Sequence, residues 1–303
     1  MITLRQLQCL VAVADTLHFR RAAERLHLSQ PALSAQIVQL EEQLGVMLIE
    51  RTRRKVLLTP IGRDTAARAK AILRDVTELE DSARRAQAPL SGTLRVGVLR
   101  TLGPYLLPHI LPELRQRYPD LKLYLREEPR ERLLAELAQG DLDILLISAA
   151  PAEDDHLTVV PLFHEPLWLT MPLGHRLADR ARLAPADLAG ERLIMLEVGD
   201  GMRDPALDLC QRSGAGEHQD FRATSLDSLR QMVATGLGTT LLPALYVQAE
   251  ALADDQVAVR PCAVGAPTRP IDMVWRRTTA RSEEYRLFAQ LLRRNLPDCV
   301  QGR

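Results

Sequence analysis

The feature that most constrains the fold is a pair of short amphipathic helix patterns near the start of the sequence. Apolar residues at helical spacing define the first of them: Phe19, Ala22, Ala23 and Leu26. After a three-residue break, a second set follows: Leu33, Ile37, Leu40 and Leu44. Ser29 can cap the second helix, Pro31 is tolerated in its first turn, and Gly45 can end it. Two short helices joined by so tight a turn predict a helix-turn-helix.

The flanking segments extend this pattern into a winged domain. Thr3 and Gln6 form a capping-box pattern that opens an earlier helix. The runs VMLIE and KVLLT are short and apolar, and the basic turn RTRR joins them, which predicts a β-hairpin. We therefore expect residues 1–59 to form a winged helix-turn-helix domain that is mostly α-helical.

A long helix pattern follows the hairpin. Thr59-Pro60 is a typical helix start, and the sequence then runs to Gln87 without a glycine after Gly62. Its heptad-like seam comprises Ile61, Thr65, Ala69, Ile72, Val76, Leu79 and Ala83. A helix of roughly 40 Å has no reason to exist inside a compact domain. We expect residues 60–87 to be a linker helix through which two chains pair.

The pattern changes at APLSG, residues 88–92, and becomes α/β. Strand-like runs alternate with helices, which favours a parallel sheet covered on both faces. We expect residues 88–303 to form a regulatory domain of two lobes, like a periplasmic binding protein. Lobe I would span about 92–163 and 270–303, and lobe II about 164–269. A cleft between such lobes suits a small ligand.

Charge and cysteine content narrow the class of protein. Residues 1–87 carry 14 Lys and Arg against 10 Asp and Glu, whereas the whole chain has 39 of each. A basic N-terminal part favours a nucleic-acid partner. No membrane-spanning run or secretory signal is evident, so we expect a cytoplasmic protein. The four cysteines are Cys9, Cys210, Cys262 and Cys299, and they form no CxxC pair. We therefore expect neither a structural zinc site nor a disulfide framework, and we expect no cofactor.

Candidate DNA-binding residues follow from the helix-turn-helix geometry. The second helix lies in the major groove with its first residues at the base edges, which here are Gln30, Pro31, Ser34 and Gln36. The wing would lie over phosphates or the minor groove, through Arg51, Arg53, Arg54 and Lys55. A basic turn alone is more often a solvated loop. The ordered combination of helices, basic hairpin and linker predicts binding to double-stranded promoter DNA.

The first ninety residues resemble the LysR family of bacterial transcription regulators. The resemblance is carried by AAERLHLSQPALSAQIVQLEEQLGVMLIER and by LTPIG. It implies a homodimer or homotetramer that acts on promoter DNA together with RNA polymerase.

The C-terminal part is similar to the hydrogen-peroxide-responsive activators of that family. Matching segments include TLGPYLLPHILPEL, PLFHEPLWL and FRATSLDSLRQMVATGLGTTLLPAL. Those activators carry a reactive cysteine in a GHC-x-RD motif, together with a second cysteine. The resemblance places Gly201 at the reactive cysteine, Asp200 at the neighbouring histidine and Cys210 at the second cysteine. It also places Arg130 at a pocket threonine, while Thr101 is kept.

A glycine has no side chain to oxidise, and a disulfide from Cys210 would need another thiol with its Cα within ~7 Å. One hypothesis is therefore a small anionic metabolite bound in the cleft, in a corner formed by Thr101, Arg130, Arg203, Thr224 and Ser225. Other interpretations stay open: Arg130 paired with a surface glutamate, Cys210 as a buried structural thiol, and a regulator that needs no effector. A cytoplasmic solute-binding protein is a further alternative, and no catalytic motif indicates an enzyme.

Overall fold

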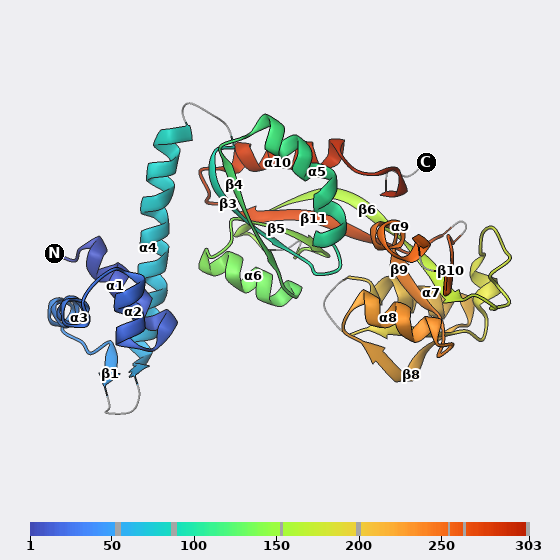
Figure 1. Ribbon diagram of the computed structural model, residues 1–303, viewed down its shortest axis with the longest axis horizontal. Coiled ribbons are helices and arrows are strands. Elements are labelled where there is room, and N and C mark those ends of the chain that lie inside the picture. Colours follow the sequence, from blue (N-terminus) through green and yellow to red (C-terminus); the bar gives the residue numbers. More distant parts are fainter. Residues whose placement is uncertain are drawn as a thin grey trace. The chain divides into compact units, whose positions relative to one another are not determined.

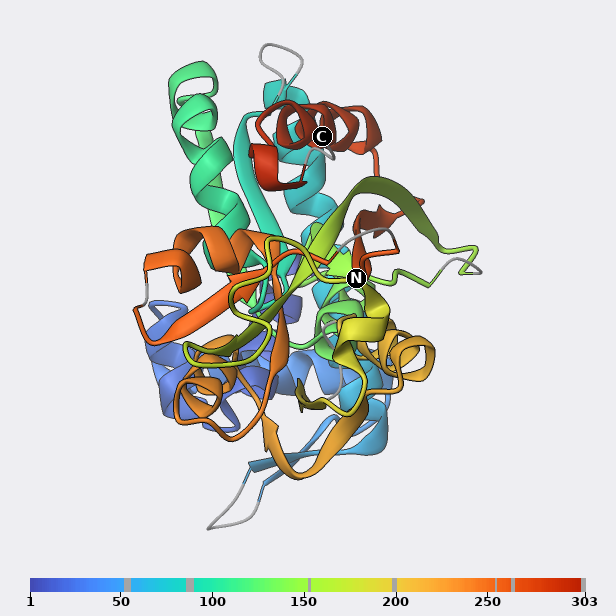
Figure 2. The same ribbon diagram turned by 90° about the vertical axis from the view of Figure 1, so that its right-hand side faces the viewer.

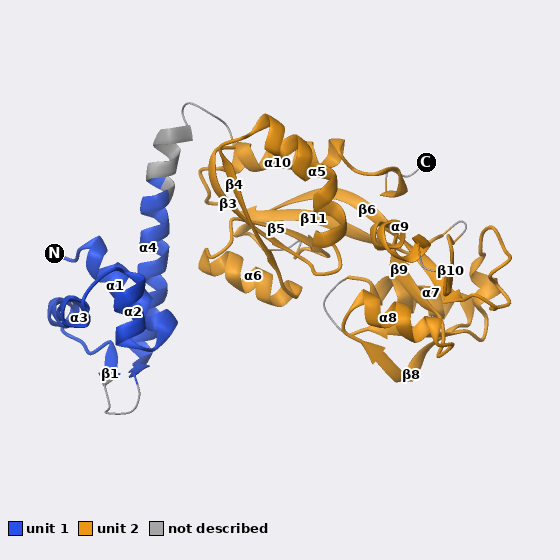
Figure 3. Cartoon of the chain, viewed as in Figure 1, with its two compact units in different colours: residues 1–88 blue, residues 89–303 orange. Residues whose placement is uncertain are grey.

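The computed structural model describes residues 1–51, 56–85, 90–151, 154–197, 201–253, 255–262 and 265–300. Within them the chain divides into two compact units, residues 1–88 and residues 89–303 (Figure 3). In the described part, no helix is both long and apolar enough to cross a membrane.

The N-terminal unit is a winged helix-turn-helix with a long final helix (Figure 1). Its elements are α1 (Leu4–Thr16), α2 (Phe19–Arg25), α3 (Gln30–Leu44), β1 (Ile49–Arg51), β2 (Val56–Leu58) and α4 (Pro60–Arg85). The capping box of Thr3 and Gln6 is confirmed. Ser29 caps α3 by accepting a hydrogen bond from the Ala32 N–H at 3.3 Å, and Gly45 ends it at φ +70°.

The core of this unit extends onto the first half of α4. Ala66 and Ala69 are buried in the same cluster as α1, α2 and α3. Asp15 of α1 pairs with Lys70 of α4 and with Arg25 of α2, each at 3.1 Å. Ala69, which the heptad spacing assigns to the pairing seam, therefore packs within its own domain instead. The seam positions Ile61, Ile72 and Leu79 remain exposed.

The C-terminal unit is built on a seven-stranded mixed sheet. Three strands are parallel, as the alternating pattern predicts: β3 (Gly92–Val98), β4 (Leu121–Glu127) and β5 (Ile144–Ser148). The sheet continues with antiparallel strands: β11 (Thr268–Arg276), β6 (Leu157–Pro172), β9 (Thr240–Pro243) and β10 (Val257–Arg260). Helices pack against it: α5 (Gly103–Arg117), α6 (Arg130–Gln139) and α10 (Ser282–Arg294).

The remaining elements form the second half of the unit. They comprise the parallel pair β7 (Arg192–Leu196) and β8 (Gly216–Ala223), then α7 (Arg203–Ser213), α8 (Leu226–Ala234) and α9 (Ala244–Ala249). Two short 3-10 turns complete it, η1 (Pro185–Leu188) and η2 (Ala251–Ala253). A third, η3 (Asp298–Val300), belongs to the first half, where Val300 is buried in the same core as α10.

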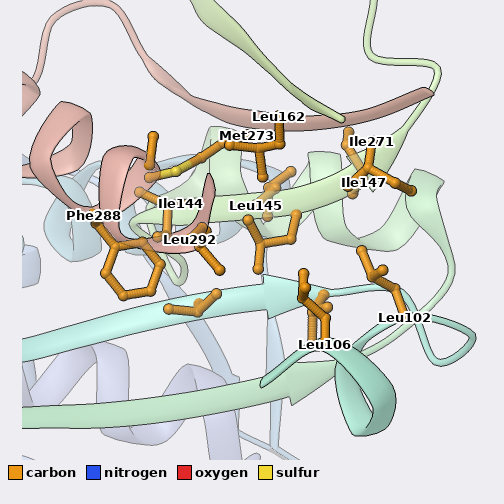
Figure 4. Close-up of a cluster of buried hydrophobic side chains, with 14 of the residues drawn as sticks. Leu102, Leu106, Ile144, Leu145, Ile147, Leu162, Ile271, Met273, Phe288 and Leu292 are labelled. Atoms are coloured by element: carbon orange, nitrogen blue, oxygen red, sulfur yellow. The ribbon is translucent and has the colours of Figure 1, made fainter. Parts of the chain in front are cut away.

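Two hydrophobic cores share the long strand β6. One core includes Leu102, Leu106, Ile144, Leu145, Ile147, Leu162, Ile271, Met273, Phe288 and Leu292 (Figure 4). The other gathers Leu167, Leu169 and Met171, from the far end of β6, with β7, α7 and α8. We call the half around the first core lobe I and the half around the second core lobe II. The strand β6 is continuous through both lobes and bends between them (yellow-green in Figures 1 and 2).

The length of β6 is not evident from the alternation of polar and apolar residues in the sequence. Pro161 and Pro166 interrupt the alternation, and proline is unusual inside a sheet because it lacks an N–H donor. Pro161 is accommodated next to a bulge, where the register with β11 shifts between Ile271 and Asp272.

A fully buried ion pair lies where the two lobes join. Arg269 of β11 binds Glu165 of β6 through Nε at 2.8 Å and Nη2 at 2.7 Å, and both side chains are 0% exposed. Arg269 also donates to the hydroxyl and the carbonyl oxygen of Thr101, at 2.8 and 2.9 Å. The other carboxylate oxygen of Glu165 accepts from the Leu245 N–H at 3.0 Å. One pair thus joins β6, β11, the loop after β3 and the start of α9.

Replacing Arg269 with methionine should lower the free energy of unfolding by about 3–5 kcal/mol, because it leaves a buried carboxylate without its cation. Denaturant unfolding of the full chain measures this loss. Arg286→Met is the matched control, since Arg286 is 52% exposed and its pairing with Glu283 should contribute about 0–1 kcal/mol. Similar losses in the two variants would contradict the role assigned to the buried pair.

Candidate DNA interface and inter-lobe site

Helix α3 has one buried face and one face open to a partner. Leu33, Ile37 and Leu40 are fully buried against the rest of the N-terminal core. The predicted base-reading residues lie in the first half of the helix. Gln30 and Pro31 are exposed there, and Ser34 and Gln36 are half-buried. The helix therefore presents a polar N-terminal half, as major-groove recognition requires.

The wing begins where the sequence predicts it, with β1 before the basic turn and β2 after it. Arg51 is the last residue of β1, and its side chain, like Arg53, Arg54 and Lys55, lies outside the described residues.

The base of the wing is fixed by a carboxylate that sequence reasoning missed. Glu41, near the end of α3, accepts hydrogen bonds from the Leu48 N–H at 2.8 Å and the Ile49 N–H at 3.0 Å. Gly62 at the start of α4 is equally necessary, because a Cβ there would lie 2.0 Å from the Leu48 carbonyl oxygen. A glutamate in an exposed-looking helical position gives no sequence signal for such a contact.

Thr101 and Arg130, two of the predicted effector-site residues, are engaged within the C-terminal unit. Thr101 is buried and is bound by Arg269 through both its hydroxyl and its carbonyl oxygen. Arg130, at the start of α6, donates to the Ala149 carbonyl oxygen at 3.0 Å and to Glu131 at 3.3 Å. The alternative in which Arg130 pairs with a neighbouring glutamate therefore describes the observed contact.

The residues expected from lobe II also have partners of their own. Arg203 makes a two-pronged ion pair with Glu217, at 2.9 and 2.8 Å, which raises the arginine pKa and lowers the carboxyl pKa. Ser225 caps α8 by accepting from the Ser228 N–H at 3.1 Å, and Thr224 is exposed. An anion bound by both Arg130 and Arg203 would have to displace these existing partners.

The segment that the resemblance aligns with the reactive-cysteine motif is only partly described. Asp200 lies outside the described residues, whereas Gly201 is placed, with φ +69°. It precedes α7, on which Cys210 lies.

All four cysteines are free thiols in environments that disfavour the thiolate. Cys9 and Cys210 are buried, and Cys262 and Cys299 are half-buried. Burial raises the pKa of each thiol, to about 11 for Cys262 and Cys299, and the charge of Glu217 raises the pKa of Cys210 further. Because the thiolate is the reactive form, none of the four resembles an activated cysteine. Among the described residues, no cluster of His, Cys, Asp or Glu could hold a metal ion.

Two family models match the chain, one on each unit. Residues 4–63 match the bacterial regulatory helix-turn-helix protein, lysR family, and residues 87–297 match the LysR substrate binding domain. Among curated proteins, the DNA-binding transcriptional dual regulator OxyR of Escherichia coli is 46% identical over 292 residues, which are 96% of this chain and 95% of that protein. A probable hydrogen peroxide-inducible genes activator of Streptomyces viridosporus is 43% identical, covering 98% of this chain and 95% of that protein.

Solved structures agree with the sequence matches. A full-length OxyR variant from Pseudomonas aeruginosa has a TM-score of 0.78 at 32% identity, covering 100% of this chain and 99% of that one. A peroxide-bound OxyR mutant from Corynebacterium glutamicum has a TM-score of 0.66 at 34% identity, covering 99% of this chain and 96% of that one. The chain therefore belongs to the LysR family of DNA-binding transcription regulators and is OxyR-like, with an effector-sensing C-terminal domain.

Proposed function

We propose that this chain regulates promoters as OxyR-like proteins do, but that its signal does not pass through oxidation of a thiol at residue 201. The observation that carries the proposal is the glycine at that position, in the segment Gly199-Asp200-Gly201-Met202-Arg203-Asp204. Relatives are described as hydrogen peroxide-inducible activators, and one solved relative is peroxide-bound. Peroxide sensing by that route needs a reactive sulfur, which glycine lacks.

Cys210 is a poor replacement for such a sulfur. Its thiol is buried, its pKa is raised, and it lies beside the negative charge of Glu217. Thiolate oxidation follows exposure and a low pKa, so both properties act against it. We infer that Cys210 is a structural thiol in the apolar core of lobe II.

DNA binding is assigned to α3 and the wing. Gln30, Pro31, Ser34 and Gln36 would lie at the base edges, and the basic wing would contact phosphates. The chain would act in the cytoplasm as a dimer or tetramer paired through α4, in contact with RNA polymerase. The exposed apolar side chains of Ile61, Ile72 and Leu79 support pairing along that helix.

The decisive experiment is a DNase footprint of the purified chain on its own upstream region, with and without micromolar hydrogen peroxide. We expect a footprint that peroxide does not change, and the same footprint for Cys210→Ser. The peroxide-inducible activator of Escherichia coli, tested in parallel, shows that the oxidant is effective. A footprint that shifts with peroxide and reverts with reductant would refute the proposal, and absence of any footprint would refute DNA binding.

Gln36→Ala should weaken binding to the specific site by about tenfold to a hundredfold, because one amide contact to a base edge contributes about 1–3 kcal/mol of discrimination. Gln43→Ala is the matched control, since Gln43 is exposed at the other end of the same helix. Titrations at several salt concentrations measure both variants, and the salt dependence should not change in either. Equal affinities for the two variants would exclude a base contact by Gln36.

Ile72→Glu should convert the paired chain to monomers at micromolar concentration, because it places a charge in the proposed apolar seam. Sedimentation velocity reports the change directly. Ala67→Glu adds the same charge on a different exposed face of α4 and should leave the pairing intact. Dissociation by both substitutions, or by neither, would contradict pairing through this seam.

A further inference from the structure

Lobe I and lobe II come into direct contact at Gly201, where a side chain would not fit. Gly201 lies two residues before the start of α7 in lobe II, and Ser148 is the last residue of β5 in lobe I. A Cβ on Gly201 would lie 1.9 Å from the Ser148 Oγ and 2.4 Å from its Cβ. The backbone of residue 201 therefore rests directly on the Ser148 side chain.

The Ser148 side chain is fully enclosed at this point of contact. Its side chain is 0% exposed, and among the described residues its hydroxyl finds no hydrogen-bond partner. A buried hydroxyl without a partner lowers stability, so the side chain contributes by filling space under Gly201.

The exit of β5 is held rigidly in the position that creates this contact. Ala149 has a left-handed backbone, at φ +51°, which a residue with a Cβ adopts only under constraint. Arg130 binds its carbonyl oxygen at 3.0 Å, and Asp272 accepts from the Ala150 N–H at 3.3 Å. Arg130 is thus a positioning residue for Ser148.

We propose that Gly201 and Ser148 form a closure contact, in which the two lobes meet with nothing between them, and that side-chain volume at residue 201 controls whether they can meet. Glycine alone combines ready access to φ +69° with the absence of a Cβ. Any other residue, cysteine included, would place its Cβ 2.4 Å from the Ser148 Cβ, so residue 201 or Ser148 would have to shift. A cysteine at residue 201 would therefore not by itself recreate a peroxide site. The contact involves residue 201, to which the proposed function also refers. The contact itself does not depend on that function, and only its role in regulation rests on it.

The test compares four variants of the full chain without DNA: Gly201→Ala, Gly236→Ala, Ser148→Gly and the double variant Gly201→Ala/Ser148→Gly. Gly236 is the matched control, because its φ is +82° and a Cβ there would meet nothing within 4 Å. Gly236→Ala therefore measures the loss of stability that alanine causes at a left-handed position when no atom clashes with its Cβ. Thermal unfolding and amide hydrogen exchange are measured for each variant.

We expect Gly201→Ala to lower the Tm by about 4 °C or more beyond the loss in Gly236→Ala. Exchange should accelerate at least about tenfold at the end of β5 and the start of α7. The double variant should regain the difference, because removing the Ser148 side chain leaves its Cα, at 3.7 Å, as the nearest atom.

Equal Tm losses in Gly201→Ala and Gly236→Ala would overturn the proposal, as would a double variant that regains nothing. If Gly201→Ala does not fold, a double variant that folds supports the closure contact, and one that does not fold refutes it. These measurements need neither DNA nor peroxide. The closure contact can therefore be refuted while the footprint supports the proposed function. The proposed function can likewise be refuted while these measurements support the closure contact.

Discussion

The ion pair of Arg269 and Glu165 is the interaction on which the arrangement of the two lobes depends. Removing two charges from water is so unfavourable that such a pair persists only with good geometry and further hydrogen bonds. Here the further partners are Thr101 and the Leu245 N–H, which belong to different elements. Satisfying the charges therefore fixes the neighbouring strands β6 and β11, the loop after β3 and the start of α9 at once. Hydrophobic contacts alone would not set their relative positions so narrowly.

This constraint changes the meaning of several residues that the sequence presents as ligand contacts. Thr101 is occupied by Arg269, Arg203 by Glu217, and Arg130 by the exit of β5. Each of these polar groups already has a partner in its own domain, so a ligand would have to compete with internal bonds of good geometry.

The local elements could be predicted from the sequence, and the contacts that connect them could not. Helix starts at Thr3 and Ser29, and the helix end at Gly45, depend on residues three or four positions apart, so the pattern reveals them. Arg269 and Glu165 lie 104 residues apart, and no local pattern pairs them. The hydrogen bonds from the wing to Glu41 could not be predicted for a related reason, because a glutamate on a helix is normally expected to be exposed to solvent. The family resemblance supplied position 201 but not its contact with Ser148.

The glycine at residue 201 affects both the chemistry and the packing of this part of the molecule. Glycine has no sulfur to oxidise, and it has no Cβ, which here would lie 1.9 Å from the Ser148 Oγ. The close approach depends on Ser148, which is followed by the left-handed turn at Ala149. On the function proposed above, the missing sulfur and the close approach to Ser148 have the same cause, which is the glycine itself. A cysteine side chain at residue 201 and the Ser148 side chain would occupy the same volume, so a sulfur could be placed there only if one of the two residues shifted.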